Sequence, residues 1–122
     1  LTAISGNKFA KDAALAIALS EEMIDRVRLN GGNDPTIYNG LISSSCDGKQ
    51  PAKSDCELWA ERLTDSKLGL ISAEGSISVV LNAEPLERSA TVTITVTWGA
   101  SKLLGGSKRS ITYTTMVEKW VA

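Results

Sequence analysis

Residues 90–98, ATVTITVTW, alternate strictly between apolar and polar side chains. A period of two places the apolar side chains on one face of an extended chain and the threonines on the other. The segment is therefore predicted to be a β-strand with one buried face, and threonine suits the open face because it is β-branched and polar. The apolar side chains of this strand are Val92, Ile94, Val96 and Trp98.

Two flanking segments show the same alternation over shorter lengths. One lies within residues 77–81 and the other near residues 110–118. The connections, 82–89 and 99–108, are short and rich in turn-forming residues, so neighbouring strands are expected to run antiparallel. A sheet of three to four antiparallel strands is predicted. Its apolar positions outside the central strand are Ile77, Val79, Leu81, Ile111, Tyr113 and Val117.

The first thirty residues carry a helical period instead. Four apolar residues recur at spacings of four, seven and three, which places them on one side of an α-helix. Asn30 and Gly31 then provide a left-handed stop. Because the helix stripe and the sheet face can cover each other, we predict an α+β fold with a long N-terminal helix packed on the sheet. The stripe consists of Ala13, Ile17, Ile24 and Val27.

Another side of the same helix carries small residues at spacings of four, namely Ala10, Ala14 and Ala18. Because alanine lets a second helix approach closely, this side is a candidate helix-packing surface. The alternative is that these alanines are simply good helix formers. The helix also lacks a clear N-terminal cap. Either it frays at the start of a self-contained domain, or it continues upstream of this sequence.

Residues 31–69 connect the helix to the sheet. Residues 31–53 are dominated by Gly, Asn, Asp, Ser and Pro, which favour turns. Ser54 and Glu57 have the spacing of a capping box, so a short helix is expected over about residues 55–65. The residues that share one face of this helix are Cys56, Trp59 and Leu63.

Cys46 and Cys56, ten residues apart, are the two cysteines of the chain. Their spacing is not that of a C-x-x-C metal or redox motif. We expect a disulfide that holds the loop against the short helix, which implies an oxidising compartment. The alternative is a pair of free buried thiols. Closing so short a loop contributes about 2–3 kcal/mol in the chain-entropy model.

The amino-acid composition limits the kinds of site and partner that the protein can have. The 122 residues fit one domain, residues 1–122, and no apolar run approaches the roughly 20 residues of a membrane span. The absence of histidine excludes histidine-dependent metal sites and Ser-His or Cys-His nucleophile pairs. Thirteen basic against fourteen acidic residues leave a net charge of −1, so no nucleic acid partner is expected. No feature indicates a metal, a cofactor or a catalytic carboxylate pair, and a non-catalytic protein is expected.

Three stretches together resemble the type IV pilus minor pilins, in particular the type IV pilus modification (PilV-like) group. They are ALAIALSEEMIDRVRLN at 14–30, YNG at 38–40, and the pairing of ELWAERL at 57–63 with VTITVTW at 92–98. The resemblance implies a single pilin-like domain. Its parts would be the C-terminal half of the pilin helix at 1–30, a connecting segment at 31–69 and the sheet at 70–122.

The resemblance also implies a role. A hydrophobic N-terminal half of the helix, absent from this sequence, would anchor the subunit in the bacterial inner membrane before assembly. Minor pilins of this group help to initiate assembly, in a tip complex with other minor pilins, a tip adhesin and the major pilin. They thereby support adhesion and twitching motility. We therefore expect a periplasmic head domain that becomes part of an extracellular pilus. No cysteine follows Cys56, so a disulfide-bounded C-terminal adhesive loop is not expected.

Other functional classes stay open. A pseudopilin of type II secretion would share the fold and differ in its partners. A ligand-binding pilin would hold DNA or a glycan, and Lys102, Lys108 and Arg109 are the neighbouring basic residues for such a site. Trp98 and Trp120 are candidate contact anchors, although packing in the core or at a sheet edge is the expected role of Trp98.

Overall fold

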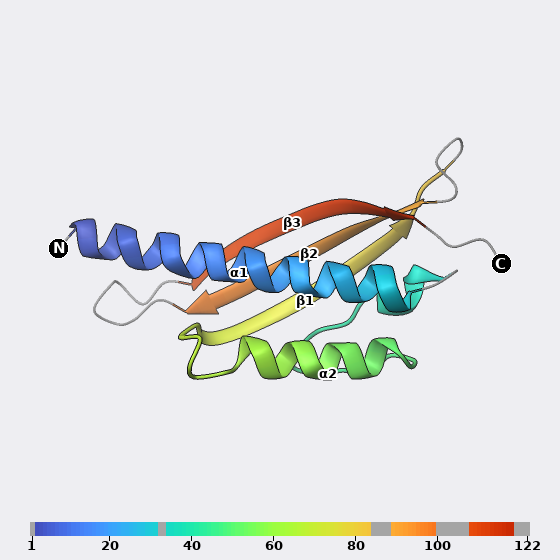
Figure 1. Ribbon diagram of the computed structural model, residues 1–122, viewed down its shortest axis with the longest axis horizontal. Coiled ribbons are helices and arrows are strands. Elements are labelled where there is room, and N and C mark those ends of the chain that lie inside the picture. The colour runs from blue at the N-terminus through green and yellow to red at the C-terminus, as the bar shows by residue number, and fades with distance from the viewer. Residues whose placement is uncertain (1, 32–33, 84–88, 100–107, 119–122) are drawn as a thin grey trace.

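The computed structural model describes residues 2–31, 34–83, 89–99 and 108–118, with the backbone alone at residues 2–8. The helices are α1 (Thr2–Asn30), the short 3-10 helix η1 (Pro35–Tyr38) and α2 (Ala52–Leu63). The strands are β1 (Ile71–Leu81), β2 (Ser89–Gly99) and β3 (Lys108–Glu118). Figure 1 shows α1 lying across one face of the sheet, with α2 beside it near β1. The predicted α+β architecture is confirmed.

The described strands form one antiparallel sheet, as predicted, and their order is β1-β2-β3. The alternating pattern of β2 determines which face of the sheet is buried. Its apolar side chains are buried on the face that α1 covers, and its threonines are half-exposed on the other face. Leu81, at the end of β1, is exposed and does not continue the buried row. The buried side chains of β2 include Val92, Ile94, Val96 and Trp98.

The buried stripe of α1 differs from the predicted one. Ile24 and Val27 are buried and Ala13 is half-buried, but Ile17 is 39% exposed, so its expected place in the helix–sheet core is wrong. Ile24 lies seven residues further on, within about 20° of Ile17 around the helix, and is fully buried. Ile17 is therefore exposed because of its position along α1: the cover that buries Ile24 does not reach it. The fully buried members are Ala16, Leu19, Met23, Ile24 and Val27.

The end of α1 is at Asn30, as predicted, but Gly31 does not adopt the expected left-handed conformation. The Gly31 N–H donates to the Val27 carbonyl at 2.8 Å. A Cβ atom at Gly31 would lie only 2.5 Å from that oxygen and 3.4 Å from Cα of Pro35. The glycine is therefore needed for close packing at the turn into η1.

α2 begins at Ala52, earlier than predicted, and the expected capping box of Ser54 and Glu57 is wrong. Ser54 lies inside the first turn, where its N–H and hydroxyl donate to Oε1 of Gln50 at 3.1 and 2.8 Å. A side chain four residues upstream thus satisfies this helical N–H. The shared face of α2 is buried, including Cys56, Trp59 and Leu63.

Trp59 joins three elements. It is fully buried, and its Nε1 donates to the Leu19 carbonyl of α1 at 3.0 Å. Its ring lies against Gly75 in β1, where an added Cβ would overlap three atoms of the indole. The glycine in β1 therefore creates the space that lets α2 dock between α1 and the strand.

Substituting Gly75→Ala should destabilise the protein by about 1–3 kcal/mol, because the indole cannot yield in a fully packed site. Gly99→Ala is the matched control in a strand, since a Cβ there meets its nearest neighbours at an ordinary 3.5 Å. Urea unfolding of both variants measures the difference. Equal midpoints for the two variants would contradict this account of Trp59.

Candidate functional site

The outer edge of β1 is closed by a segment that precedes α2, residues 39–43. The Gly40 N–H donates to the Ile77 carbonyl at 2.9 Å, and the Ile77 N–H donates to the Leu41 carbonyl at 2.9 Å. These are strand-like bonds on the side of β1 that faces away from β2. We call residues 39–43 the edge segment.

Two side chains of the edge segment extend this pairing. Ser43 donates its N–H to the Gly75 carbonyl at 2.8 Å and accepts the Gly75 N–H on its hydroxyl at 2.9 Å. Asn39 accepts the Val79 N–H on Oδ1 at 2.8 Å. The N–H groups of β1 that point outward at these positions are therefore satisfied without a fourth strand.

The Cys46–Cys56 disulfide holds the edge segment in place. The two Cα atoms lie 5.6 Å apart, and the predicted pairing is confirmed. Cys56 is fully buried in α2, whereas Cys46 is half-buried just beyond the edge segment. The bridge thus connects the closed edge of β1 to α2, and through Trp59 to α1.

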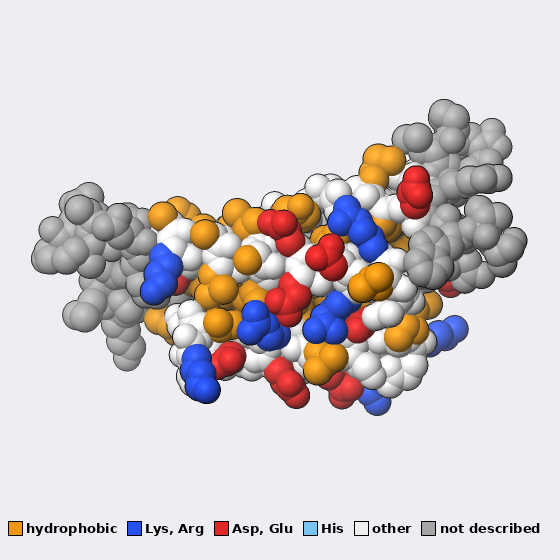
Figure 2. Space-filling view, in the orientation of Figure 1, with side chains coloured by type: hydrophobic (Ala, Val, Ile, Leu, Met, Phe, Trp, Pro, Cys, Tyr) orange, Lys and Arg blue, Asp and Glu red, His pale blue; other side chains and the backbone are white. Residues whose placement is uncertain are grey.

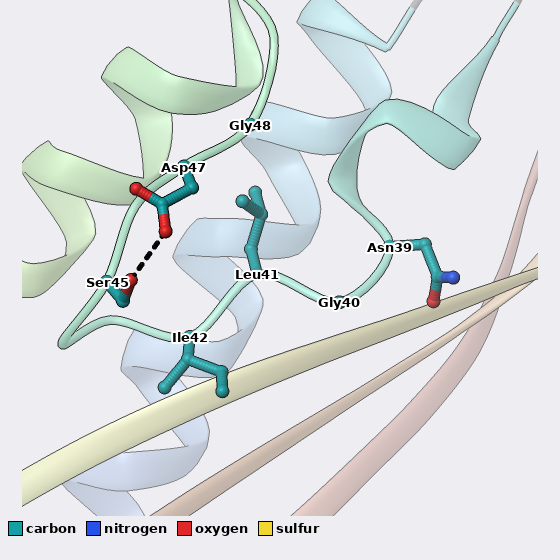
Figure 3. A pocket seen from close by; sticks show the side chains of 7 residues that line it. All are labelled: Asn39, Gly40, Leu41, Ile42, Ser45, Asp47 and Gly48. Atoms are coloured by element: carbon teal, nitrogen blue, oxygen red, sulfur yellow. Dashed lines mark hydrogen bonds between the residues drawn. The ribbon is translucent and has the colours of Figure 1, made fainter.

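A hollow of about 290 Å³ lies beside the edge segment (Figure 3). Within it, the Ser45 hydroxyl donates to Oδ2 of Asp47 at 2.7 Å, and Oδ1 of Asn39 accepts the Val79 N–H at 2.8 Å, so the three polar side chains already have partners. The other lining residues are Leu41, Ile42 and two glycines. The hollow is a shallow surface feature, and its lining residues are Asn39, Gly40, Leu41, Ile42, Ser45, Asp47 and Gly48.

Asp55 forms a buried polar junction that sequence reasoning missed. Its carboxylate accepts the Tyr38 hydroxyl at 2.5 Å, the Asn30 side-chain amide at 2.9 Å and Nη1 of Arg26 at 3.4 Å. The Asp55 side chain is only 6% exposed. One carboxylate therefore connects α1, η1 and α2, and this network has the character of a structural junction. The SDCE stretch had indicated only a helix cap.

The junction changes the acidity of Tyr38. Burial of the ring, followed by the hydrogen bond and the negative charge of Asp55, raises the pKa of Tyr38 well above its ordinary value of 10.0. The hydroxyl therefore stays protonated and acts as a donor to the carboxylate across the alkaline range.

Charged side chains of both signs are interspersed over α1 and α2 (Figure 2). Glu22 of α1 accepts from Arg62 of α2 at 3.2 Å and also lies 4.0 Å from Arg26. Such half-exposed pairs contribute little to stability, typically up to about 1 kcal/mol. They orient α2 along α1 and leave no strongly basic or acidic surface on this face.

Residues 10–18 of α1 present one exposed side. The predicted helix-packing residues Ala10, Ala14 and Ala18 are all exposed, and so is Ile17. They form the surface that we call the outer helix face. Figure 1 shows the first turns of α1 extending beyond the strands.

Aromatic packing fixes α1 at the end of the sheet. Phe9 stacks on Trp98 with ring centroids 6.4 Å apart, and the Arg109 guanidinium lies 5.3 Å from the Phe9 centroid. Trp98 is only 1% exposed and acts as a core residue, not as a contact anchor. Lys108 and Arg109 open β3, while Lys102 and Trp120 lie outside the described residues.

In the part of the chain that the structure describes, no group of three or more His, Cys, Asp or Glu side chains could hold a metal ion. Over the same residues, no helix combines the length and the apolar character needed to cross a membrane. Comparisons with family models, curated proteins and solved structures find no match to this chain. The features of the molecule that bear on its function are the edge segment, the polar junction and the outer helix face.

Removing the disulfide by the double substitution Cys46→Ser/Cys56→Ala should release the edge segment and lower stability by about 2–4 kcal/mol. Hydrogen exchange should accelerate at the amides of Gly75, Ile77 and Val79, whose acceptors lie in that segment. Amides of β2 that bond to β3 serve as the internal control, because they report only global unfolding. Unchanged protection at the three β1 amides would show that the bridge does not hold the edge closed.

Substituting Tyr38→Phe should remove the loss of unfolding free energy that the Tyr38 hydroxyl causes at alkaline pH. The pKa of Tyr38 is raised in the folded state, so as the pH rises the unfolded chain releases the phenol proton first. The stability that the protonated Tyr38 contributes is therefore complete below pH 10 and is lost progressively above it. The wild type should lose up to about 1.4 kcal/mol per pH unit beyond the loss seen in Tyr38→Phe. Urea unfolding of both proteins between pH 8 and about 11 measures this. Parallel pH profiles would contradict the buried junction.

Proposed function

We propose that this chain is the head domain of a type IV pilus minor pilin, a non-catalytic subunit that helps to initiate pilus assembly. In this role it contacts other minor pilins, a tip adhesin and the major pilin, and so supports adhesion and twitching motility. It resides at the inner membrane and in the periplasm before assembly and in the extracellular pilus afterwards.

One observation carries the proposal: two sides of α1 have different surroundings. One side of this 29-residue helix is buried against the rest of the domain and includes Ala16, Leu19, Met23, Ile24 and Val27. Another side, over residues 10–18, exposes the small and apolar side chains of the outer helix face. A helix that holds its own domain with one side and offers another to a neighbour suits a subunit of a helical fibre.

The remaining features support the same use. The disulfide suits an oxidising compartment such as the periplasm or the cell exterior. Trp59, the Asp55 junction and the bridge fix α2 and the edge segment to α1, so force or contact applied to the head is transmitted to the helix. The proposed mechanism is thus binding through a rigid head, with no chemical step.

Binding between this domain and the head domains of other minor pilins from the same organism tests the proposal. Ala14→Arg should weaken a complex that uses the outer helix face by about tenfold or more, while keeping helix propensity. Ser78→Arg, an exposed position on the open face of the sheet, is the control and should bind as the wild type does. Biolayer interferometry measures both.

Other binding results would overturn the proposal in different ways. Binding to pseudopilins of type II secretion instead of minor pilins would assign the domain to secretion. A salt-sensitive gel shift with DNA would favour a ligand-binding pilin. Binding to none of the minor pilin head domains would remove the proposed role while leaving the fold unaffected.

A further inference from the structure

The two edges of the sheet differ in whether another segment covers them. The edge of β1 is covered by the edge segment and has a register irregularity between Ile71 and Glu74. β3 pairs with β2 in unbroken register over its 11 residues, and no other described segment pairs with its outer side. A long, regular and uncovered strand edge is a template for pairing with another extended chain.

The charges of β3 indicate which chain fits this edge. The strand, KRSITYTTMVE, begins with Lys108 and Arg109, ends with Glu118 and carries no charge between them. Lys108 and Glu118 are exposed and make no ion pair within the described residues. In an antiparallel pair of two such strands the basic end of each meets the acidic end of the other, whereas a parallel pair would align like charges.

We propose that β3 pairs antiparallel with β3 of a second copy of this chain, in a register centred on Tyr113. In this register Lys108 lies opposite Glu118 of the second copy, and the two-fold symmetry forms this pair twice. The two three-stranded sheets then become one continuous sheet with closed outer edges, because the edge segment covers β1 in each copy.

The register also preserves both faces of the sheet. On the open face, Thr112 meets Thr114 of the second copy, which repeats the Thr95–Thr112 and Thr93–Thr114 contacts at 3.5 and 3.3 Å inside each protein. On the helix face, Tyr113 meets its own counterpart.

The helix face gains burial from the same pairing. Ile111, Tyr113 and Thr115 are half-buried in the single copy, so their remaining surface would be covered by the second one. Apolar and β-branched side chains paired across neighbouring strands are the ordinary source of sheet stability.

The position of α1 allows the pairing. α1 packs over β2 and β3, and strands lie about 4.8 Å apart, so α1 and its counterpart would stand roughly 10 Å apart. This is an ordinary packing distance for two helices. The two-fold axis is perpendicular to the sheet, so both helices lie on the same face and run in opposite directions.

The inference does not rest on the proposed function and goes beyond it. Two subunits of one fibre, whose helices run in the same direction, cannot pair through this axis. Two head domains carried by separate fibres can do so, because their helices approach from opposite ends. Within the proposed function the pairing would be a contact between fibres and not a contact within one, while the pairing of the free domain does not depend on that function.

Charge reversal tests the pairing in the free domain. Sedimentation velocity over a concentration series should show a monomer–dimer equilibrium for the wild type. Lys108→Glu and Glu118→Lys should each weaken it by about tenfold or more, because each creates two like-charge pairs. The double variant Lys108→Glu/Glu118→Lys should restore it. Glu57→Lys, at an exposed position of α2, is the control and should leave the equilibrium unchanged.

Cysteine cross-linking tests the register. Under mild oxidation Tyr113→Cys should form a covalent dimer, since directly opposite Cβ atoms lie about 5 Å apart. Met116→Cys, exposed on the same strand, should not, because it would lie roughly 20 Å from its counterpart. A monomer at all concentrations would overturn the proposal. So would a double charge variant as weak as the single ones, or cross-linking of Met116→Cys as rapid as that of Tyr113→Cys.

Discussion

The arrangement of this domain depends on one side chain, Trp59. Its ring fills the space over Gly75 in β1, and its Nε1 bonds to a carbonyl of α1, so one residue of α2 fixes the distance between the helix and the strand. A Cβ at Gly75 and the indole cannot both be accommodated. Because α2 is seated in this way, Cys56 and Asp55 on the same helix come to face the edge segment and η1.

Cys56 and Asp55 of α2 then contact different parts of the domain. Cys56 holds the segment that closes the edge of β1, and Asp55 gathers donors from α1 and η1 in a setting where an unpaired carboxylate would be costly. The side-chain bonds between elements are therefore concentrated among α1, α2 and β1. The other side of the sheet, at β3, keeps a regular and uncovered edge among the described residues. The cross-linked side suits a subunit that transmits contact, and the uncovered edge suits pairing.

Features encoded by short-range periodicity were predictable. The alternation in β2, the end of α1 at Asn30 and the shared face of Cys56, Trp59 and Leu63 could be read from neighbouring residues. Features that depend on distant partners were not. Ile17 was misplaced because a helical stripe does not reveal how far along the helix its cover extends: Ile24 on the same side is buried and Ile17 is exposed. The capping prediction for α2 failed because Gln50, outside the pattern, supplies the acceptor. The edge segment and the Asp55 junction arise from contacts between residues far apart in sequence.

A double-mutant cycle between Trp59 and Gly75 tests the central claim most directly. Trp59→Phe removes the outer ring atoms that a Cβ at Gly75 would overlap, while it keeps an aromatic side chain in the site. If the ring requires the space over Gly75, the cost of Gly75→Ala should fall by at least about 1 kcal/mol in the Trp59→Phe background. Unfolding free energies that simply add would contradict the claim that this contact positions α2 against the sheet.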